Sequence, residues 1–266
     1  MTIEHPCTWA ISPPNLLLAK DDVHLWLLEL DQPTECAQHL AQILSPDELQ
    51  RARNFYFEKD RRQFIVGRAW LRVLLGNYMH VEPEKLHLYY GNHGKPLALT
   101  LPPGDVLHFN LSHSQGLALY AFTLNREIGV DIEHIHQIHE EGQIVAYFFS
   151  DEEKAVFCTL PADQQHLMFF KSWTQKEAYL KAIGEGLSRS LDEITVSLSP
   201  DQPAQLLSVK GNAEEHLRWR LQTFKPTPDY IATLAVEGQN WNLACLTAVI
   251  DNNVSSDYDD SPMMLR

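Results

Sequence analysis

The feature that most limits how this 266-residue chain can fold is a helix-start signal that occurs twice, each time followed by a long helical stretch and then by strands. Residues 45–48 (Ser-Pro-Asp-Glu) place a serine at the cap, a proline at the first helical position and a glutamate three residues after the cap. Residues 150–153 (Ser-Asp-Glu-Glu) repeat this capping box 105 residues later. Apolar side chains at helical spacing predict a long helix around residues 64–78 after the first box and roughly over residues 162–183 after the second.

Short apolar and alternating stretches predict strands in both parts of the chain. The predicted strands cover residues 23–30, 86–90, 108–112, 117–122, 129–133, 194–198, 206–209, 219–224, 231–236 and 241–249. We therefore expect an α+β protein with two similar α/β halves, each a long helix packed on antiparallel strands, related by a pseudo-twofold axis. The halves are predicted over residues 1–125 and 126–250. Residues 251–266 are acidic and serine-rich without periodicity, and we expect a disordered tail there.

The composition excludes several classes of protein. The formal net charge of −14 argues against binding nucleic acid through a general basic surface. No apolar run approaches the ~18 residues of a membrane helix. The four cysteines are scattered, which indicates reduced thiols and a cytoplasmic location. Seven of the 21 basic residues lie between Arg51 and Arg72, so an anionic ligand would meet a local basic cluster there.

The acidic strand Gly129-Val130-Asp131-Ile132-Glu133 is the first candidate for chemistry. Residues two apart share a face of a strand, so Asp131 and Glu133 point one way while the two apolar side chains point into a core. Two carboxylates held this close repel one another unless water or a cation screens them. A solvated strand face and a divalent cation site are both consistent with these five residues.

The second long helix adds a further carboxylate and an ammonium on one face. Thr174, Glu177 and Lys181 share that face, and a surface ion pair is the simpler interpretation of the last two. Together with Asp131 and Glu133, however, Glu177 completes a set of three carboxylates, which is the hard oxygen environment that Mg²⁺ prefers. Lys176 and Lys181 would add charge for phosphate oxygens.

These stretches resemble a known family. The sequences G-V-D-I-E at 129–133 and W-T-Q-K-E-A-Y-L-K at 173–181 are similar to the two signature motifs of the 4′-phosphopantetheinyl transferases. Three further motifs resemble those of the Sfp-type members, which are pseudodimeric monomers: S-P-D-E-L-Q-R at 45–51, G-K-P at 94–96 and F-N-L-S-H-S at 109–114. The resemblance runs from about residue 23 to residue 250.

The resemblance implies a Mg²⁺-dependent enzyme that moves the phosphopantetheine arm of coenzyme A to a serine of an acyl or peptidyl carrier protein and releases 3′,5′-ADP. It implies metal ligands at Asp131, Glu133 and Glu177, and catalytic roles for Glu153, Glu177 and Lys181. The residues expected to contact coenzyme A are Arg51, Gly94, Lys95, Pro96, Asn110, Ser112, His113, Asp131, Lys176 and Lys181. The partners would be coenzyme A and a carrier protein, with neither nucleic acid nor membrane, and the protein would be a monomer.

Three points stay open at this stage. The resemblance implies that Glu153 helps to deprotonate the attacking serine while paired with Lys176, but Glu153 could instead serve only as the acid of its capping box. Glu48 stands where some relatives carry a lysine, so the 3′-phosphate of coenzyme A would depend on Arg51 and on neighbours such as Arg62 or Arg68. The alternatives to a transferase are another Mg²⁺-dependent phosphate-transfer enzyme and a non-catalytic relative that still binds carriers.

Overall fold

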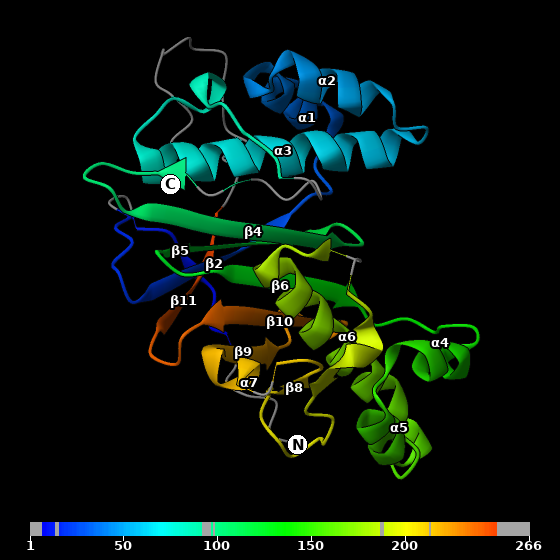
Figure 1. The fold of residues 1–266 in the computed structure, drawn as a ribbon. Helices are drawn as coiled ribbons and strands as arrows, with labels where there is room; N and C mark the ends of the chain where they lie inside the picture. The colour runs from blue at the N-terminus through cyan, green and yellow to red at the C-terminus, as the bar shows by residue number, and fades with distance from the viewer. Residues whose placement is uncertain are drawn as a thin grey trace.

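The computed structural model describes residues 7–13, 16–91, 97, 99–186, 189–212 and 214–248 (Figure 1). Three predicted contacts of coenzyme A, Gly94, Lys95 and Pro96, lie outside these residues, as does the predicted tail at 251–266.

Helices and strands alternate in blocks along the chain. The helices are α1 (Thr34–Leu40), α2 (Pro46–Arg53), α3 (Glu58–Met79), α4 (Glu141–Phe148), α5 (Asp151–Phe157), α6 (Ala162–Ile183) and α7 (Glu215–Arg218). The strands are β1 (Ala10–Ile11), β2 (Asp22–Glu29), β3 (Leu99–Thr100), β4 (Val106–Ser114), β5 (Leu117–Leu124), β6 (Ile128–His134), β7 (Ile194–Val196), β8 (Leu206–Val209), β9 (Trp219–Phe224), β10 (Tyr230–Glu237) and β11 (Asn242–Thr247). Within the described residues, no helix is both long enough and apolar enough to span a bilayer.

Most of the predicted elements are confirmed, and one strand is wrong. Both capping boxes form, at the start of α2 and of α5, and the second long helix has the predicted bounds. No strand covers residues 86–90, where only Tyr90 takes part in an isolated bridge. The carbonyls of Pro83 and Leu86 instead accept hydrogen bonds from Nη1 of Arg72, at 2.9 and 3.1 Å, so this segment is tied to α3 by a side chain.

The strand order shows the internal duplication directly. The larger sheet has the order β1-β11-β2-β5-β4-β3, and a second sheet has the order β6-β10-β9. In the segment β2-β5-β4 the central strand is antiparallel to both neighbours, and β6-β10-β9 repeats this arrangement. Each repeat places a capped short helix and a 22-residue helix between its first strand and its last two. The predicted α+β architecture of two similar halves is confirmed.

Strand β11 lies outside this repeat. It comes from the end of the chain but pairs in parallel with β2 and with β1, in the sheet of the first half. The division into functional halves at residue 125 stays a prediction, and the fold shows that the last strand crosses it.

The two sheets share one core, and the long helices cover the outer faces. Side chains of β2, β5, β6 and β10, among them Val23, Leu25, Val130 and Ile132, are buried together between the sheets. The opposite faces are covered by α3 over the larger sheet and by α6 over β6 and β10 (Figure 1). The acidic strand therefore buries its apolar side chains between the sheets, as predicted, and turns Asp131 toward α6.

Gly129 allows α6 to approach β6 closely. A Cβ atom at this position would lie 2.0 Å from the carbonyl oxygen of Ala178 and 2.4 Å from the amide nitrogen of Ala182. In the first half the corresponding strand and helix positions carry His24 and Tyr78, whose side chains fill the space and hydrogen-bond at 2.8 Å. In the second half the close approach instead lets Lys181 of the long helix reach Asp131 of the first strand.

Candidate active site

The acidic strand is attached to the first half by alternate polar side chains of β4. Oδ1 of Asn110 accepts a hydrogen bond of 2.9 Å from the backbone N–H of Val130. Oγ of Ser112 donates to Oδ1 of Asp131 at 3.0 Å. Asn110 and Ser112, predicted to contact coenzyme A, therefore also fix β6 along β4, and their alternation on one strand face is a signal that the sequence contained.

The same face of β4 continues to the second acid of the strand. Oγ of Ser114 donates to Oε2 of Glu133 at 3.2 Å and accepts from the backbone N–H of His134 at 3.1 Å. Sequence reasoning did not assign Ser114 a role, although it is the third residue of the alternation.

Asp131 is the centre of the site. Its side chain is almost fully buried, and Nζ of Lys181 donates to its Oδ1 at 2.6 Å and to Oγ of Ser112 at 2.8 Å. Its second oxygen, Oδ2, is buried and has no hydrogen-bond partner. A buried carboxylate oxygen without a partner is unfavourable, so this atom is the place where a cation would be stabilising.

Glu133 and Glu177 lie within the field of Asp131. Burial raises the pKa of each glutamate, the charge of Asp131 raises it further, and Lys181 opposes the effect. The three predicted ligands therefore belong to one electrostatic cluster. Among the described residues, however, no three His, Cys, Asp or Glu side chains converge on a common point as a finished metal site does.

A cavity of about 260 Å³ lies between α2, α3, β4 and β5, and His113 in its wall is close enough to Lys181 to feel its charge. Arg51, Arg68 and His113 line it together with aromatic rings, and the guanidinium groups of Arg51 and Arg68 lie 5.3 and 5.8 Å from the ring centre of Phe64. Burial lowers the pKa of His113, and the charge of Lys181 lowers it further. The structure thus places Arg51 and His113 in one cavity.

Glu48 is not directed at a phosphate. It is buried, accepts from Nε of Arg72 at 2.6 Å and lies 3.5 Å from Nε of Arg68. Of the two neighbours considered for the 3′-phosphate, Arg68 is among the described residues that line the cavity and Arg62 is not. Nη1 of Arg68 is buried without a partner, which leaves it available to an anion.

The structure does not bring Glu153 and Lys176 to the acidic cluster. They form a buried ion pair of 2.5 Å, and Nζ of Lys176 also donates to the carbonyls of Phe148 and Leu191 at 2.8 and 2.9 Å. Burial lowers the pKa of Lys176, against the raising effect of Glu153. The roles of Lys176 in binding coenzyme A and of Glu153 in catalysis stay predictions.

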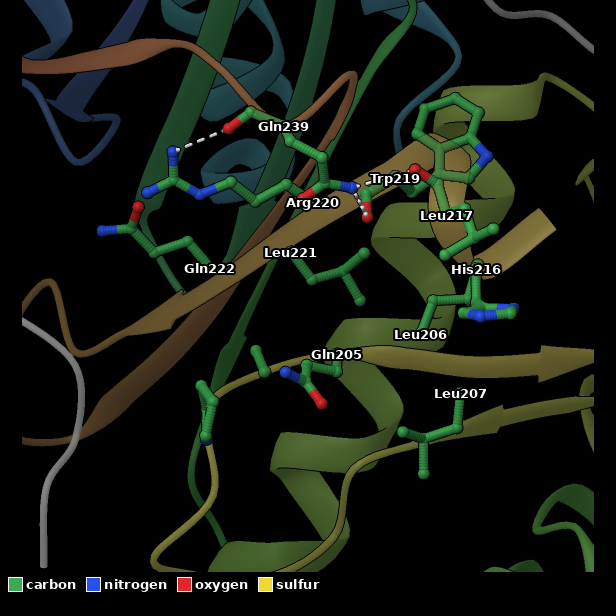
Figure 2. Close-up of a pocket in the computed structure, with 12 residues that line it drawn as sticks. Gln205, Leu206, Leu207, His216, Leu217, Trp219, Arg220, Leu221, Gln222 and Gln239 are labelled. Carbon is green, nitrogen blue, oxygen red and sulfur yellow. Dashed lines mark hydrogen bonds between the residues drawn. The ribbon is translucent and has the colours of Figure 1, made fainter. Parts of the chain in front are cut away.

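A larger cavity of about 760 Å³ lies apart from all of these residues (Figure 2). It is formed by β8, β9 and α7, and Figure 2 shows Arg220 hydrogen-bonded to the backbone of Gln239 at its rim. The described residues that line it include no carboxylate and none of the predicted site residues. The candidate site is therefore the acidic cluster together with the smaller cavity, which are linked through His113 and Lys181.

Comparison with known proteins decides the family. Residues 127–235 match the model of the 4′-phosphopantetheinyl transferase superfamily, and residues 32–124 match that of the 4′-phosphopantetheinyl transferase N-terminal region. The chain is 42% identical to the 4′-phosphopantetheinyl transferase HetI of Nostoc sp. (strain PCC 7120) over 88% of its own length and 95% of that protein. The chain belongs to the 4′-phosphopantetheinyl transferase superfamily.

More distant members of the superfamily match over most of their length as well. The identity is 27% to the putative transferase slr0495 of Synechocystis sp. (strain PCC 6803), over 87% of this chain and 88% of that one. It is 28% to the transferase Sfp of Bacillus subtilis, over 76% of this chain and 86% of that one. The predicted resemblance is confirmed, and the two matched regions meet between the end of β5 and the start of β6.

Proposed function

We propose that this superfamily member transfers the 4′-phosphopantetheine group of coenzyme A to a serine of an acyl or peptidyl carrier protein. The new bond joins the serine oxygen to the phosphorus that carries pantetheine, and the serine hydroxyl proton is released to solvent. The bond from that phosphorus to the bridging oxygen breaks, which releases 3′,5′-ADP. The observation that carries the proposal is the buried Asp131, whose Oδ1 is held by Lys181 and whose Oδ2 has no partner. The charge of Lys181 also acts on His113, which lines a cavity with two guanidinium groups.

The acidic cluster fits a Mg²⁺ ion that is bound partly by substrate. Asp131 would hold the ion through its unpartnered oxygen, with Glu133 and Glu177 beside it, and phosphate oxygens and water would complete the shell. This accords with the lack of three converging protein ligands among the described residues, because Mg²⁺ rarely uses an all-protein cage. When bound, the ion would neutralise the diphosphate and help the ADP group to leave.

The remaining residues bind and orient coenzyme A. Arg51, Arg68 and His113 suit the phosphorylated nucleotide, since guanidinium groups bind phosphate in pairs of hydrogen bonds and the cavity offers aromatic walls. Lys181 reaches from α6 to Asp131 and Ser112 and so lies where a diphosphate would extend from the cavity toward the acids. Catalysis of this kind depends on positioning and charge neutralisation.

The cellular location, the oligomeric state and the mode of carrier docking follow from properties of the whole chain. We expect a cytoplasmic monomer, because the described cysteines are free thiols and the internal duplication supplies both halves of the site. The net charge of −14 would repel an acidic carrier at long range, so docking would rely on apolar contacts and on the basic residues of α2 and α3.

The test is to incubate the protein with coenzyme A, Mg²⁺ and several apo carrier proteins and to measure the intact mass of each carrier. We expect the mass increment of one phosphopantetheine group on at least one carrier and none without Mg²⁺. Release of phosphate from coenzyme A without a carrier would indicate a phosphohydrolase. Carrier binding without any increment would indicate a non-catalytic relative.

A further inference from the structure

The buried pair Glu153–Lys176 has a counterpart in the first half. Glu48 is the third residue of α2, and Glu153 is the third residue of α5, each the acid of its capping box. Arg72 follows the first residue of α3 by 14 positions, and Lys176 follows the first residue of α6 by the same number. Each glutamate thus pairs with a base at the same point of the following long helix.

The bonds around the two pairs also correspond. Arg72 donates to the carbonyls of Pro83 and Leu86, both of which follow α3. Lys176 donates to the carbonyls of Phe148 and Leu191, and the second of these follows α6. Each pair therefore joins a capped helix, a long helix and the segment that comes after it.

The first half keeps this pair but has no counterpart of the acidic cluster. By strand register and helix position, Asp131 corresponds to Trp26, and Glu177 corresponds to Val73, both buried in the core. A buried acid–base pair in a half without carboxylate cluster must be there for the fold. Because the two halves are related by duplication, we expect the Glu153–Lys176 pair to serve the fold as well.

Glu153 also has no free oxygen for a substrate proton. Oε2 accepts from the backbone N–H of Ser150 at 2.7 Å and contacts Lys176, while Oε1 accepts from the backbone N–H of Val196 at 2.9 Å and from Ser172 at 3.3 Å. The side chain of Glu153 is 1% exposed. A general base must come within hydrogen-bond reach of the proton that it removes.

We propose that Glu153 and Lys176 are positioning residues and that Glu153 is not the general base of the transfer. The pair fixes the rotation and height of α6, and Lys176 is the chain neighbour of Glu177, so the pair acts on the site by holding Glu177 and Lys181 opposite Asp131. The inference rests on the proposed transfer activity and concerns which residues perform it.

The test compares Glu153→Gln with the double variant Glu153→Gln/Lys176→Met, and uses Glu48→Gln as the matched control in the first half. The single variant leaves Lys176 buried without its counter-ion, so we expect a lower Tm and an increase of about threefold to tenfold in the Mg²⁺ concentration for half-maximal rate. In the double variant both the Tm and the Mg²⁺ concentration for half-maximal rate should return most of the way to the parent values. Its kcat at saturating Mg²⁺ should lie within about tenfold of the parent protein. Glu48→Gln should lower Tm without changing the Mg²⁺ requirement.

Two results would overturn the proposal. One is a double variant that regains its Tm while kcat stays about 100-fold or more below the parent, as loss of a general base would produce. The other is a Glu48→Gln variant that shifts the Mg²⁺ requirement as much as Glu153→Gln does.

If neither Glu153 variant folds, the Lys176→Arg variant serves instead, because arginine is the base at this position in the first half. We expect its kcat to stay within about threefold of the parent protein. A 100-fold loss of kcat at unchanged Tm would contradict the inference. Absence of transfer by the parent protein would refute the proposed function instead.

Discussion

At the scale of single residues, the site depends on side chains that are buried and only partly satisfied. Asp131 has one oxygen bound by Lys181 and Ser112 and one without a partner. Arg68 likewise has a buried, unpartnered Nη1 at the cavity. Since buried polar atoms usually have partners, these two atoms indicate where a cation and an anion bind.

His24 offers a test of the residue-level account that does not depend on activity. Nε1 of Trp26 donates to the hydroxyl oxygen of Tyr78 at 2.9 Å, and the same hydroxyl forms a hydrogen bond of 2.8 Å with Nδ1 of His24. Burial lowers the pKa of His24 to about 4, although the charge of Asp22 opposes this. The unfolded chain therefore binds the proton first, and stability that is present above the ordinary His pKa is lost as the pH falls toward 4.

We predict that this histidine alone costs about 2 kcal/mol of unfolding free energy between pH 7 and pH 5. Between pH 7 and pH 5 the unfolding free energy of the His24→Asn variant should fall by about 2 kcal/mol less than that of the parent protein, because asparagine does not titrate. Denaturant unfolding at the two pH values measures the difference. An equal pH dependence in both proteins would show that His24 is not held neutral by this network.

At the scale of elements, the site depends on how closely α6 approaches β6. Gly129 and Ala182 make the contact, whereas the first half has His24 and Tyr78 between its strand and helix. The glycine of the acidic motif is therefore explained by packing of the helix backbone, which brings Glu177 and Lys181 to Asp131.

The Gly129→Ala variant should displace α6, because the added methyl group would overlap the Ala178 carbonyl. We expect a loss of about 3 kcal/mol in unfolding free energy and a fall in transfer rate larger than the loss of folded protein explains. Gly142→Ala is the matched control, since a Cβ there meets nothing within 4 Å, and it should change stability by less than about 0.5 kcal/mol. Equal effects of the two substitutions would contradict the close-approach account.

The sequence predicted the elements that its local chemistry determines. Two capping boxes, the bounds of α6 and the two faces of the acidic strand are confirmed because each depends on neighbouring residues. The predicted strand at 86–90 is wrong because Arg72 of α3, 14 residues before Leu86, donates to the Leu86 carbonyl. The burial of Lys176 was missed for the same reason, since spacing on one helix cannot show what packs against it from α5.

At the scale of the whole molecule, β11 joins the two halves into one folding unit. It follows β10 in the chain but pairs with β2, and a core shared by both sheets lies between them. We therefore expect a single cooperative thermal transition, with equal calorimetric and van't Hoff enthalpies.

The Leu246→Ala variant in β11 tests whether the two halves unfold together. Leu246 is buried in the core beneath α3, so we expect a loss of about 2 to 3 kcal/mol and a lower Tm for the whole protein. Leu217→Ala, at a side chain that is 64% exposed, should have little effect. Two calorimetric peaks, of which the substitution shifts only one, would show that the halves fold separately.

The most direct test of the central claim is the rate of carrier modification by the Asp131→Asn variant, followed by intact mass with coenzyme A and Mg²⁺ in excess. The substitution keeps the size of the side chain and removes the charge that would hold the metal, so we predict a loss of about 100-fold or more. The Tm should change by only a few degrees, and Asp201→Asn at an exposed turn should transfer at the parent rate. Mg²⁺-dependent transfer by Asp131→Asn at a rate near that of the parent protein would contradict the account.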